Sequence, residues 1–230
     1  MQKKHTDKIA ISDLRQLWYD LRWIYPYSFN RIFARWGISI LCLFLIVSAF
    51  YLDPSFRLVF TGIQNSFADS VFTFGRWYGN GTPTLYGFVL LYAAGLYMKN
   101  DKVRDTGLLI GESYCFSGLL TLVFKSVFGR WRPYTAQGDL SFGGWSLTDN
   151  DQFSFFSGHS QTAFALSVIL ASSTNNIYLK VFFYLLAVIT GFSRIYHDQH
   201  WLSDVVMGAV VAIWIGKVLI SFHMDRFTRK

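Results

Sequence analysis

Apolar residues gather in six blocks along this chain, and polar or basic segments separate the blocks. The blocks span residues 36–52, 84–98, 106–128, 162–173, 177–193 and 204–222. A bilayer core is crossed by about 20 helical residues, so the shorter blocks need flanking residues, and we expect the fourth to begin near Ser157. The pattern predicts an all-α fold, a six-transmembrane helical bundle that occupies residues 36–230 as one membrane domain.

The segment before the first block, residues 1–35, has a different pattern. Basic and aromatic residues recur at helical spacing over residues 9–27, which is typical of an amphipathic helix on the inner leaflet. A partly ordered cytoplasmic tail is the alternative interpretation. No short apolar core followed by small residues is present, so we expect no cleaved signal peptide.

A glycine-rich stretch, residues 75–81, lies between the first two blocks. It lacks the lysine and the strand–helix context of a phosphate-binding loop. We interpret it as a turn at the membrane interface.

The composition agrees with a membrane protein. Hydrophobic residues make up 52% of the chain, aromatic residues 19% and charged residues only 15%, against about a quarter charged in soluble domains. The net charge of +7 is dispersed between apolar blocks, which argues against a nucleic-acid partner. Cys42 and Cys115 both lie inside apolar blocks, so we expect neither a disulfide framework nor a zinc site.

The distribution of Lys and Arg predicts the orientation. With six spans, fifteen of these residues fall on one side of the membrane, which the positive-inside rule makes cytoplasmic, together with both termini. Six cations remain on the outer side: Arg57, Arg76, Lys125, Arg130, Arg132 and Arg194. Four of these six belong to, or lie beside, the three sequence fragments that carry the candidate chemistry.

The three fragments combine cations, histidines and a carboxylate in an otherwise apolar sequence. They are Lys125-(six residues)-Arg132-Pro133, Ser157-Gly158-His159, and Ser193-Arg194-(five residues)-His200-(three residues)-Asp204. The predicted third and fifth spans run outward and end at two of the fragments, whereas the fourth and sixth run inward and begin at fragments. The topology therefore predicts that all three meet at the outer face, where they could hold a phosphate, attack it and protonate its leaving group.

Local spacing suggests how the parts cooperate. Lys125 and Arg132 are seven residues apart and would share a helix face if the helix persists to Pro133. His200 and Asp204 are spaced i, i+4, so the carboxylate could hold one ring nitrogen and leave the other free as a nucleophile or base.

The fragments also have individual explanations that involve no catalysis. Arg194 and the lysine could be interfacial anchors, His159 a satisfied core histidine, and the His200–Asp204 pair an ordinary helix-surface contact. All of these would have to coincide on one membrane face, so we favour the joint, functional interpretation. Two further polar residues stand outside the pattern: Glu112, expected to pair with a neighbouring helix, and His197, expected to be an interface residue.

The segments KSVFGRWRP, FSGH and SRIYHDQHWLSD resemble the signature of the type 2 phosphatidic acid phosphatase superfamily, which also contains vanadium-dependent haloperoxidases. The resemblance runs from the third predicted span to the sixth. One position departs from the family pattern, because Phe156 stands where the family usually has proline. Proline there would stiffen the entry to the helix, so the change concerns loop rigidity more than chemistry.

The resemblance implies a role for each motif residue. His200, oriented by Asp204, would attack phosphorus and form a phosphohistidine, and His159 would protonate the leaving oxygen and then activate water. The residues that would bind phosphate are Lys125, Arg132, Arg194, Ser157, Gly158 and Ser193. Neither a metal nor another cofactor is expected, since the cations would stabilise the charge.

The sequence thus predicts an integral membrane phosphatase that hydrolyses phosphomonoester or diphosphate groups of lipids. Polyprenyl diphosphate, phosphatidate, phosphatidylglycerol phosphate and lipid A remain open as substrates. A lipid phosphotransferase using the same phosphohistidine is the alternative, and a haloperoxidase or a non-catalytic scaffold is less favoured. The expected partners are the lipid substrate and the bilayer, with neither nucleic acid nor an obligate protein partner. In a bacterium, the enzyme would lie in the inner membrane with its site facing the periplasm.

Overall fold

The described part of the chain consists of helices joined by short connections and one long loop. The computed structural model describes residues 11, 13–15, 18 and 36–227. Its long helices are α2 (Trp36–Gly62), α3 (Ser66–Tyr78), α4 (Gly81–Met98), α5 (Asp101–Phe128), α6 (Gly158–Ser172), α7 (Ile177–Tyr196) and α8 (Leu202–Phe227). Two short 3₁₀ helices, η1 (Pro133–Thr135) and η2 (Asn150–Gln152), lie in the long loop between α5 and α6. The all-helical prediction is confirmed for this part of the chain.

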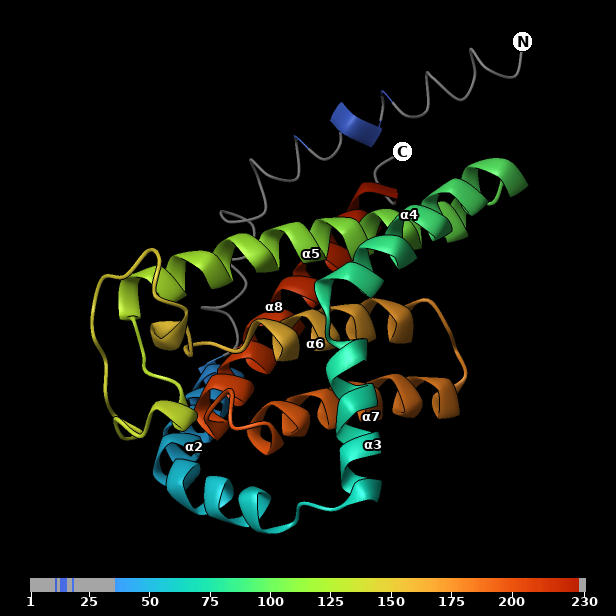
Figure 1. The fold of residues 1–230 in the computed structure, drawn as a ribbon. Coiled ribbons are helices and arrows are strands. Elements are labelled where there is room, and N and C mark those ends of the chain that lie inside the picture. The colour runs from blue at the N-terminus through green and yellow to red at the C-terminus, as the bar shows by residue number, and fades with distance from the viewer. Residues whose placement is uncertain (1–10, 12, 16–17, 19–35, 228–230) are drawn as a thin grey trace.

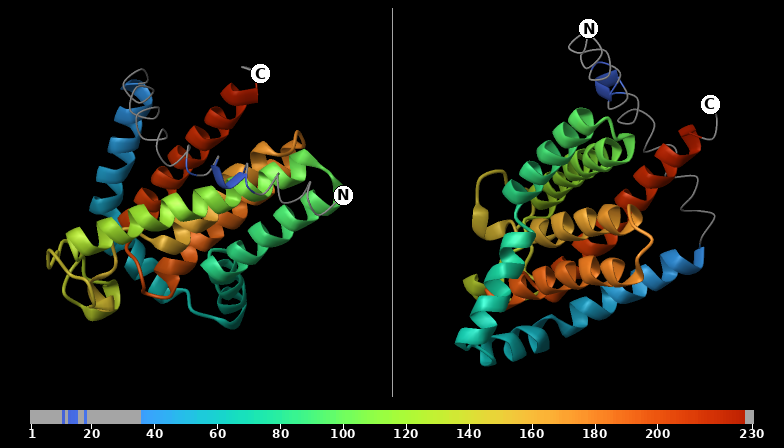
Figure 2. Two further views of the ribbon diagram at one scale, coloured as in Figure 1. Left: turned by 90° about the horizontal axis from the view of Figure 1, so that it is seen from above. Right: turned by 90° about the vertical axis from the view of Figure 1, so that its right-hand side faces the viewer.

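Helix α6 lies at the centre of the bundle, against α5, α7 and α8 (Figure 1). Helix α4 pairs with α5, α2 packs against the start of α8, and α3 packs across α7 (Figure 2). An apolar cluster joins the loop before α6 to α8, with Phe155 and Phe156 packed near Val211, Ile215 and Leu219. The helix at the centre of the bundle is thus the one whose start carries the Ser157-Gly158-His159 fragment.

Four of the described helices are long and apolar enough to cross a membrane. They are the segments Ile38–Gly62, Asp101–Phe128, Ile177–Tyr196 and Leu202–His223. The other two predicted spans coincide with α4 and α6, which are helical but have 18 and 15 residues. The count of six spans and the orientation of the termini stay predictions.

The region between the first two apolar blocks is more helical than the sequence suggests. Helix α2 continues ten residues past the predicted end, and residues 75–78, interpreted as part of a turn, belong to α3. The Asn65 side chain accepts hydrogen bonds from the Phe67 and Ala68 amides and so caps the start of α3. Gly75 lets α3 approach α7, because a Cβ there would lie 2.9 Å from the Ile189 carbonyl oxygen. The sequence prediction of a turn over 75–81 is therefore wrong except around Gly79 and Asn80.

Most of the predicted N-terminal amphipathic helix, residues 9–27, lies outside the described residues. Asp13 is described, and its carboxylate accepts a hydrogen bond of 3.0 Å from the Tyr92 hydroxyl and lies 3.8 Å from Arg104. This part of the N-terminal segment therefore contacts α4 and α5.

Helix α5 ends at a left-handed turn that redirects the chain toward the bundle. Gly129 has φ +52° and its amide donates to the Lys125 carbonyl, 3.0 Å away. Arg132 therefore follows a loop rather than continuing the face of Lys125, and the proposed helix as far as Pro133 is not formed. The backbone then folds back on itself, since the Ser154 amide donates to the Arg130 carbonyl at 3.0 Å.

Close packing of α8 on the start of α6 depends on Gly208. A Cβ at this position would lie 2.7 Å from the Ser157 carbonyl oxygen, which is backbone and cannot turn aside. We expect Gly208→Ala to destabilise the fold by about 1–3 kcal/mol, as overpacking does. Gly118→Ala in α5, where nothing lies within 4 Å, is the matched control, and it should be neutral or slightly stabilising because alanine favours the helix more than glycine does. Thermal unfolding in detergent checks this, and equal melting temperatures for the two variants would contradict it.

Candidate active site

The three motif fragments meet at one end of the bundle, where α5 and α7 finish and α6 and α8 begin. The Ser157 amide donates to the Asp204 carbonyl at 3.0 Å, which ties the start of α6 to α8. Arg132 Nη1 donates to Gln199 Oε1 at 2.6 Å, which ties the loop after α5 to the connection between α7 and α8. We call this end of the bundle the site end. The predicted convergence of the fragments is present in the structure.

His200 is almost fully buried, two residues before the start of α8. Its Nδ1 lies 2.9 Å from the Ser154 carbonyl oxygen. A carbonyl can only accept, so Nδ1 carries the ring hydrogen and Nε2 holds the free lone pair of the neutral ring. The nearest Asp204 oxygen is 3.7 Å from Nδ1, an ion-pair distance too long for a hydrogen bond. The i, i+4 spacing therefore does not place the carboxylate on the ring, because His200 precedes the helix and Ser154 takes the hydrogen bond.

Asp204 is held in place by three other groups. Its Oδ1 accepts from Arg130 Nη1 at 2.6 Å, and its Oδ2 accepts from Ser154 Oγ at 2.5 Å and from the Trp201 amide at 2.9 Å. Ser154 thus serves both partners, since its carbonyl contacts His200 and its hydroxyl contacts Asp204. The sequence motifs do not include Ser154. Only its position, three residues before Ser157 of the second fragment, could have suggested that it contributes to the site.

Burial decides the charge of the histidine. It lowers the pKa of His200 well below the ordinary 6.5, and the charges of Lys125 and Arg132 act in the same direction, while Asp204 opposes them. The imidazole is therefore neutral at pH 7. Burial also lowers the pKa of Arg132 from its ordinary value of 12.5. Because that ordinary value is far above 7, Arg132 remains a cation at pH 7.

The three motif cations differ in how fully the protein satisfies them. Arg132 donates from Nε to the Asn150 carbonyl at 2.9 Å and from Nη2 to its side-chain oxygen at 3.0 Å. Arg194 is buried in the last turn of α7, and its Nε and Nη1 have no hydrogen-bond partner within the described chain. No carboxylate among the described residues pairs with Lys125 or Arg194. Buried donors without partners are costly, and an anion would satisfy them.

The start of α6 completes the site end. Ser157 is the N-cap, and its Oγ accepts from the Ser160 amide at 3.4 Å and lies 3.0 Å from the Ser160 hydroxyl. Gly158 and His159 are the first two residues of the helix, where backbone N–H groups and the helix dipole favour an anion. The Ser193 hydroxyl donates to the Thr190 carbonyl at 2.7 Å. Both serine hydroxyls thus have partners within their own helices, and phosphate binding by Ser157, Gly158 and Ser193 stays a prediction.

The residues outside the motif pattern have structural partners. Glu112 Oε2 lies 3.1 Å from His223 Nε2 of α8, so the expected pairing with a neighbouring helix is confirmed. His197 Nδ1 lies 2.6 Å from the Ser193 carbonyl. Phe156 is fully buried, and its ring centroid lies 5.2 Å from that of Phe124.

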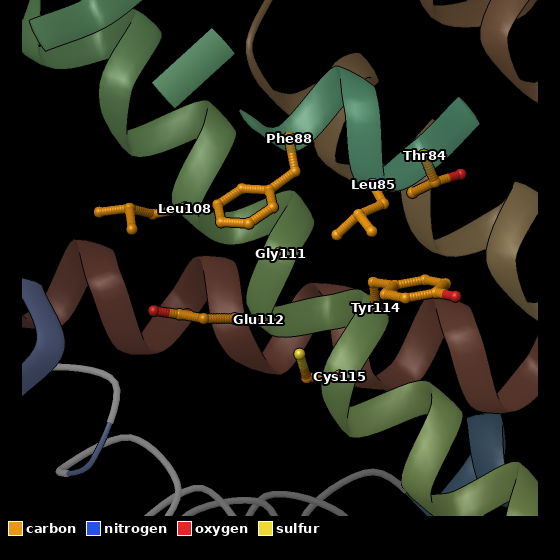
Figure 3. Close-up of a pocket in the computed structure, with 8 residues that line it drawn as sticks. All are labelled: Thr84, Leu85, Phe88, Leu108, Gly111, Glu112, Tyr114 and Cys115. Atoms are coloured by element: carbon orange, nitrogen blue, oxygen red, sulfur yellow. The ribbon is translucent and has the colours of Figure 1, made fainter. Parts of the chain in front are cut away.

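A hollow between α4 and α5 is separate from the motif residues. In Figure 3, Leu85 and Phe88 project from α4 toward α5. The lining residues are Thr84, Leu85, Phe88, Leu108, Gly111, Glu112, Tyr114 and Cys115. None of the motif residues lines it, so this hollow does not contain the chemistry of the site end. Within the described residues, no group of three or more His, Cys, Asp or Glu side chains is arranged to hold a metal ion.

Comparison with known proteins identifies the family. The model of the PAP2 superfamily matches residues 106–228, which is more than half of the chain and includes all three fragments. The chain belongs to the PAP2 superfamily. This PAP2 protein is an integral membrane protein, because it has helices long and apolar enough to cross a membrane and because it is related to membrane proteins of the same family.

The relatives of this PAP2 chain include lipid phosphatases. It is 37% identical over 83 residues to the lipid A 1-phosphatase of Porphyromonas gingivalis, a match that covers 35% of this chain and 19% of that protein. The chain thus spans about a fifth of the length of the curated relative it matches. The crystal structure of Aquifex aeolicus LpxE is similar with a TM-score of 0.57 and 23% identity, over 74% of this chain and 95% of that one. The Bacillus subtilis PAP2 type phosphatidylglycerolphosphate phosphatase has a TM-score of 0.61 and 21% identity, over 82% and 95%. These two structures share the fold.

The unpartnered donors of Arg194 predict tight binding of a phosphate-like anion. Inorganic phosphate should raise the melting temperature of the detergent-solubilised protein, since a ligand of the folded state stabilises it. Arg194→Ala should weaken this protection at least about tenfold in phosphate concentration, the scale of a lost charge-assisted hydrogen bond. Lys102→Ala, an exposed cation at the other end of α5, is the control. Equal protection in the two variants would contradict an anion site at Arg194.

Proposed function

We propose that this PAP2 protein is a lipid phosphatase that transfers the phosphoryl group of its substrate to His200 and then to water. The observation that carries the proposal is the state of His200. Its Nδ1–H is committed to the Ser154 carbonyl, its Nε2 lone pair is free, and the neighbouring Arg194 has buried nitrogens without partners. A neutral nucleophile beside an unfilled cation cluster suits attack on a phosphate.

In the first step, the Nε2 lone pair of His200 attacks phosphorus and the bond between phosphorus and the lipid oxygen breaks. The leaving oxygen takes a proton from His159, and the bound phosphate anion would favour the protonated ring against the opposing effects of burial and the surrounding cations. Lys125, Arg132 and Arg194 stabilise the charge on the equatorial oxygens, assisted by the Gly158 N–H at the start of α6. The products are the dephosphorylated lipid and a phosphohistidine.

In the second step, the phosphohistidine is hydrolysed. Neutral His159 accepts a proton from water as the water oxygen attacks phosphorus, and the bond between phosphorus and Nε2 breaks. Inorganic phosphate leaves, His200 regains its lone pair, and His159 is again protonated. Asp204, 3.7 Å from the ring, stabilises the positive charge that His200 carries in the intermediate. The cation cluster supports chemistry without a metal ion.

The orientation of the protein follows from the charge distribution. Fifteen Lys and Arg residues fall on the side opposite the site end if the chain crosses six times, so the site end faces outward and both termini are cytoplasmic. In a bacterial cell this places the enzyme in the inner membrane with its site at the periplasmic surface. The substrate is accordingly a phosphorylated lipid of the outer leaflet.

The similarity to a lipid A 1-phosphatase makes a lipid A phosphate the first substrate to test. Polyprenyl diphosphate, phosphatidate and phosphatidylglycerol phosphate share the same phosphate chemistry and complete the panel. A lipid phosphotransferase is the alternative function, since the phosphohistidine could pass its phosphoryl group to an acceptor lipid. No cofactor, nucleic acid or obligate protein partner is part of the proposal.

Release of inorganic phosphate from this panel, with EDTA present and no acceptor lipid, tests the proposed function. We expect release from at least one lipid and a loss of several orders of magnitude in His200→Ala, as for a removed nucleophile. His197→Gln changes a histidine three residues away and off the motif pattern, and it should retain most of the activity.

Two outcomes of this experiment would contradict the proposal. In a parallel reaction with an acceptor lipid, dephosphorylation of the substrate only when the acceptor is present, with the phosphate recovered on the acceptor and not as inorganic phosphate, would favour the phosphotransferase. Full activity of His200→Ala would show that the reaction does not pass through a phosphohistidine at His200.

The buried environment predicts how His200 titrates. Because burial lowers its pKa, the neutral ring persists as the pH falls through 6.5, and the nucleophile stays available below that value. A titration of ¹⁵N-labelled histidine, with His200→Asn to assign the signal, should place the midpoint well below pH 6.5. The same shifts should report a proton on Nδ1. A midpoint at or above 6.5 would show that the site is not desolvated as described.

A further inference from the structure

Helix α2 lies outside the segment matched by the PAP2 family, yet it places a carboxylate beside the motif residues. Asp53 is fully buried. Its Oδ1 accepts from the Ser203 amide at 2.8 Å, and its Oδ2 accepts from the Ser203 hydroxyl at 2.6 Å and from Arg130 Nη2 at 2.8 Å. Ser203 is the second residue of α8, so Asp53 satisfies one of the N–H groups that a helix start leaves without an internal partner. Asp204 is the next residue.

Arg130 joins Asp53 to Asp204. Its Nη1 donates to Asp204 Oδ1 and to the Ser203 hydroxyl, both at 2.6 Å. Its Nε donates to the Asp139 carbonyl at 3.0 Å, and Nη2 donates to the same carbonyl as well as to Asp53. A guanidinium has five N–H donors, and these contacts use all five.

The faces of the Arg130 guanidinium are covered as well. Its central carbon lies 4.8 Å from the centroid of Phe50, 5.3 Å from that of Phe142 and 5.6 Å from that of Trp201. The side chain is fully buried. Arg130 therefore has no donor left for a phosphate, in contrast to Arg194, and its role must act through the residues that it holds.

We propose that Asp53 and Arg130 are positioning residues that hold Asp204 and the first turn of α8, and through them set the charge and orientation of His200. This inference rests on the proposed function. Neither residue touches the substrate. Through Asp53, helix α2, which lies outside the segment matched by the PAP2 family, would help to position the catalytic histidine.

The sharing of one guanidinium by two carboxylates has an electrostatic consequence. A single Arg130–Asp204 pair would largely cancel the field of Asp204 at the imidazole 3.7 Å away. Asp53 pairs with the same guanidinium, so the two carboxylates and the one cation (Asp53, Asp204 and Arg130) together carry one net negative charge. That charge favours the positive ring of the phosphohistidine intermediate, and it acts strongly because the groups are buried.

Other charged and titratable groups also act on His200. They are Lys125 of α5, Arg132 in the loop after α5 and Asp204 of α8. His159 of α6 and Arg194 of α7 also belong to the site end, and the charge of Arg194 acts on His159. Substitutions of Asp53 or Arg130 keep the charge of each of these groups, but they change the hydrogen bonds that hold Asp204. A change in the pH dependence of these variants therefore reports the removed charge together with any movement of Asp204.

The test compares Asp53→Asn and Arg130→Gln with Arg57→Gln in the purified protein. Arg57 lies one turn after Asp53 on α2 and makes a paired contact with Asp198 at 2.8 Å, from Nε and Nη2. It is partly exposed and has no contact with Asp204, so Arg57→Gln is a matched loss of an ion pair between α2 and the α7–α8 connection. We expect Asp53→Asn and Arg130→Gln to lower kcat by about 10- to 100-fold with KM changed less than about threefold, the scale of lost supporting contacts. Arg57→Gln should stay within about twofold.

The pH profile distinguishes a positioning role from a loss of stability. Asp53→Asn removes a negative charge, which makes protonation of His200 harder and moves the acid limb of kcat/KM to lower pH. Arg130→Gln removes a positive charge and should move the same limb to higher pH. Destabilisation alone predicts no such opposite shifts.

Each outcome has a consequence for the inference. Variants of Asp53 and Arg130 that match Arg57→Gln in kcat and in pH profile would overturn it, whereas absence of phosphate release by the wild-type protein would instead overturn the proposed function. If a single variant does not fold, it is replaced by the double variant Asp53→Asn/Arg130→Gln, which removes the buried Asp53–Arg130 pair as a whole and leaves Asp204 with its Ser154 and Trp201 hydrogen bonds. A double variant with wild-type kcat would also overturn the inference.

Discussion

The site end depends on one buried cation, the guanidinium of Arg130. A buried charge in a bilayer protein is costly unless it is paired and hydrogen-bonded. Arg130 meets this constraint by binding Asp53 of α2, the Asp139 carbonyl of the long loop, and Ser203 and Asp204 of α8. These contacts fix the positions of three separate segments relative to the end of α5. The alignment of His200 follows, because Ser154 binds the Arg130 backbone, the Asp204 carboxylate and the imidazole at once.

The cations at this end of the bundle divide by how many of their hydrogen bonds the protein supplies. Arg130 uses all its donors, Arg132 uses three of its five on Asn150 and Gln199, and Arg194 has two buried nitrogens without a partner in the described chain. The number of hydrogen bonds that the protein supplies to each arginine thus distinguishes an arginine with a structural role from one available to bind an anion. The saturated arginine holds the scaffold, and under the proposed function the unsatisfied Arg194 is the residue at which a phosphate would gain most.

Much of this arrangement can be predicted from the sequence, and the rest cannot for identifiable reasons. The spacing of the motif residues and the alternation of apolar blocks place His159, His200 and Arg194 at one end of the bundle, as the structure has them. The contribution of Asp53 has no local signal, because its partners Arg130 and Ser203 are 77 and 150 residues away. The i, i+4 spacing brings the Asp204 carboxylate to 3.7 Å from the His200 ring, but it does not predict that the Ser154 carbonyl takes the Nδ1 hydrogen bond. Helix α3 was missed because glycines that read as a turn, Gly75 above all, serve close packing against α7.

In the proposed mechanism, the Ser154 carbonyl holds the proton of His200 on Nδ1 and so directs phosphoryl transfer to Nε2. The most direct measurement is to quench the enzyme during a single turnover of a phosphorylated lipid and to locate the phosphate by ³¹P NMR and mass spectrometry. We expect an acid-labile, alkali-stable phosphohistidine at His200 with phosphorus on Nε2. Phosphate on Nδ1, on another residue, or on no residue of the enzyme would contradict this account.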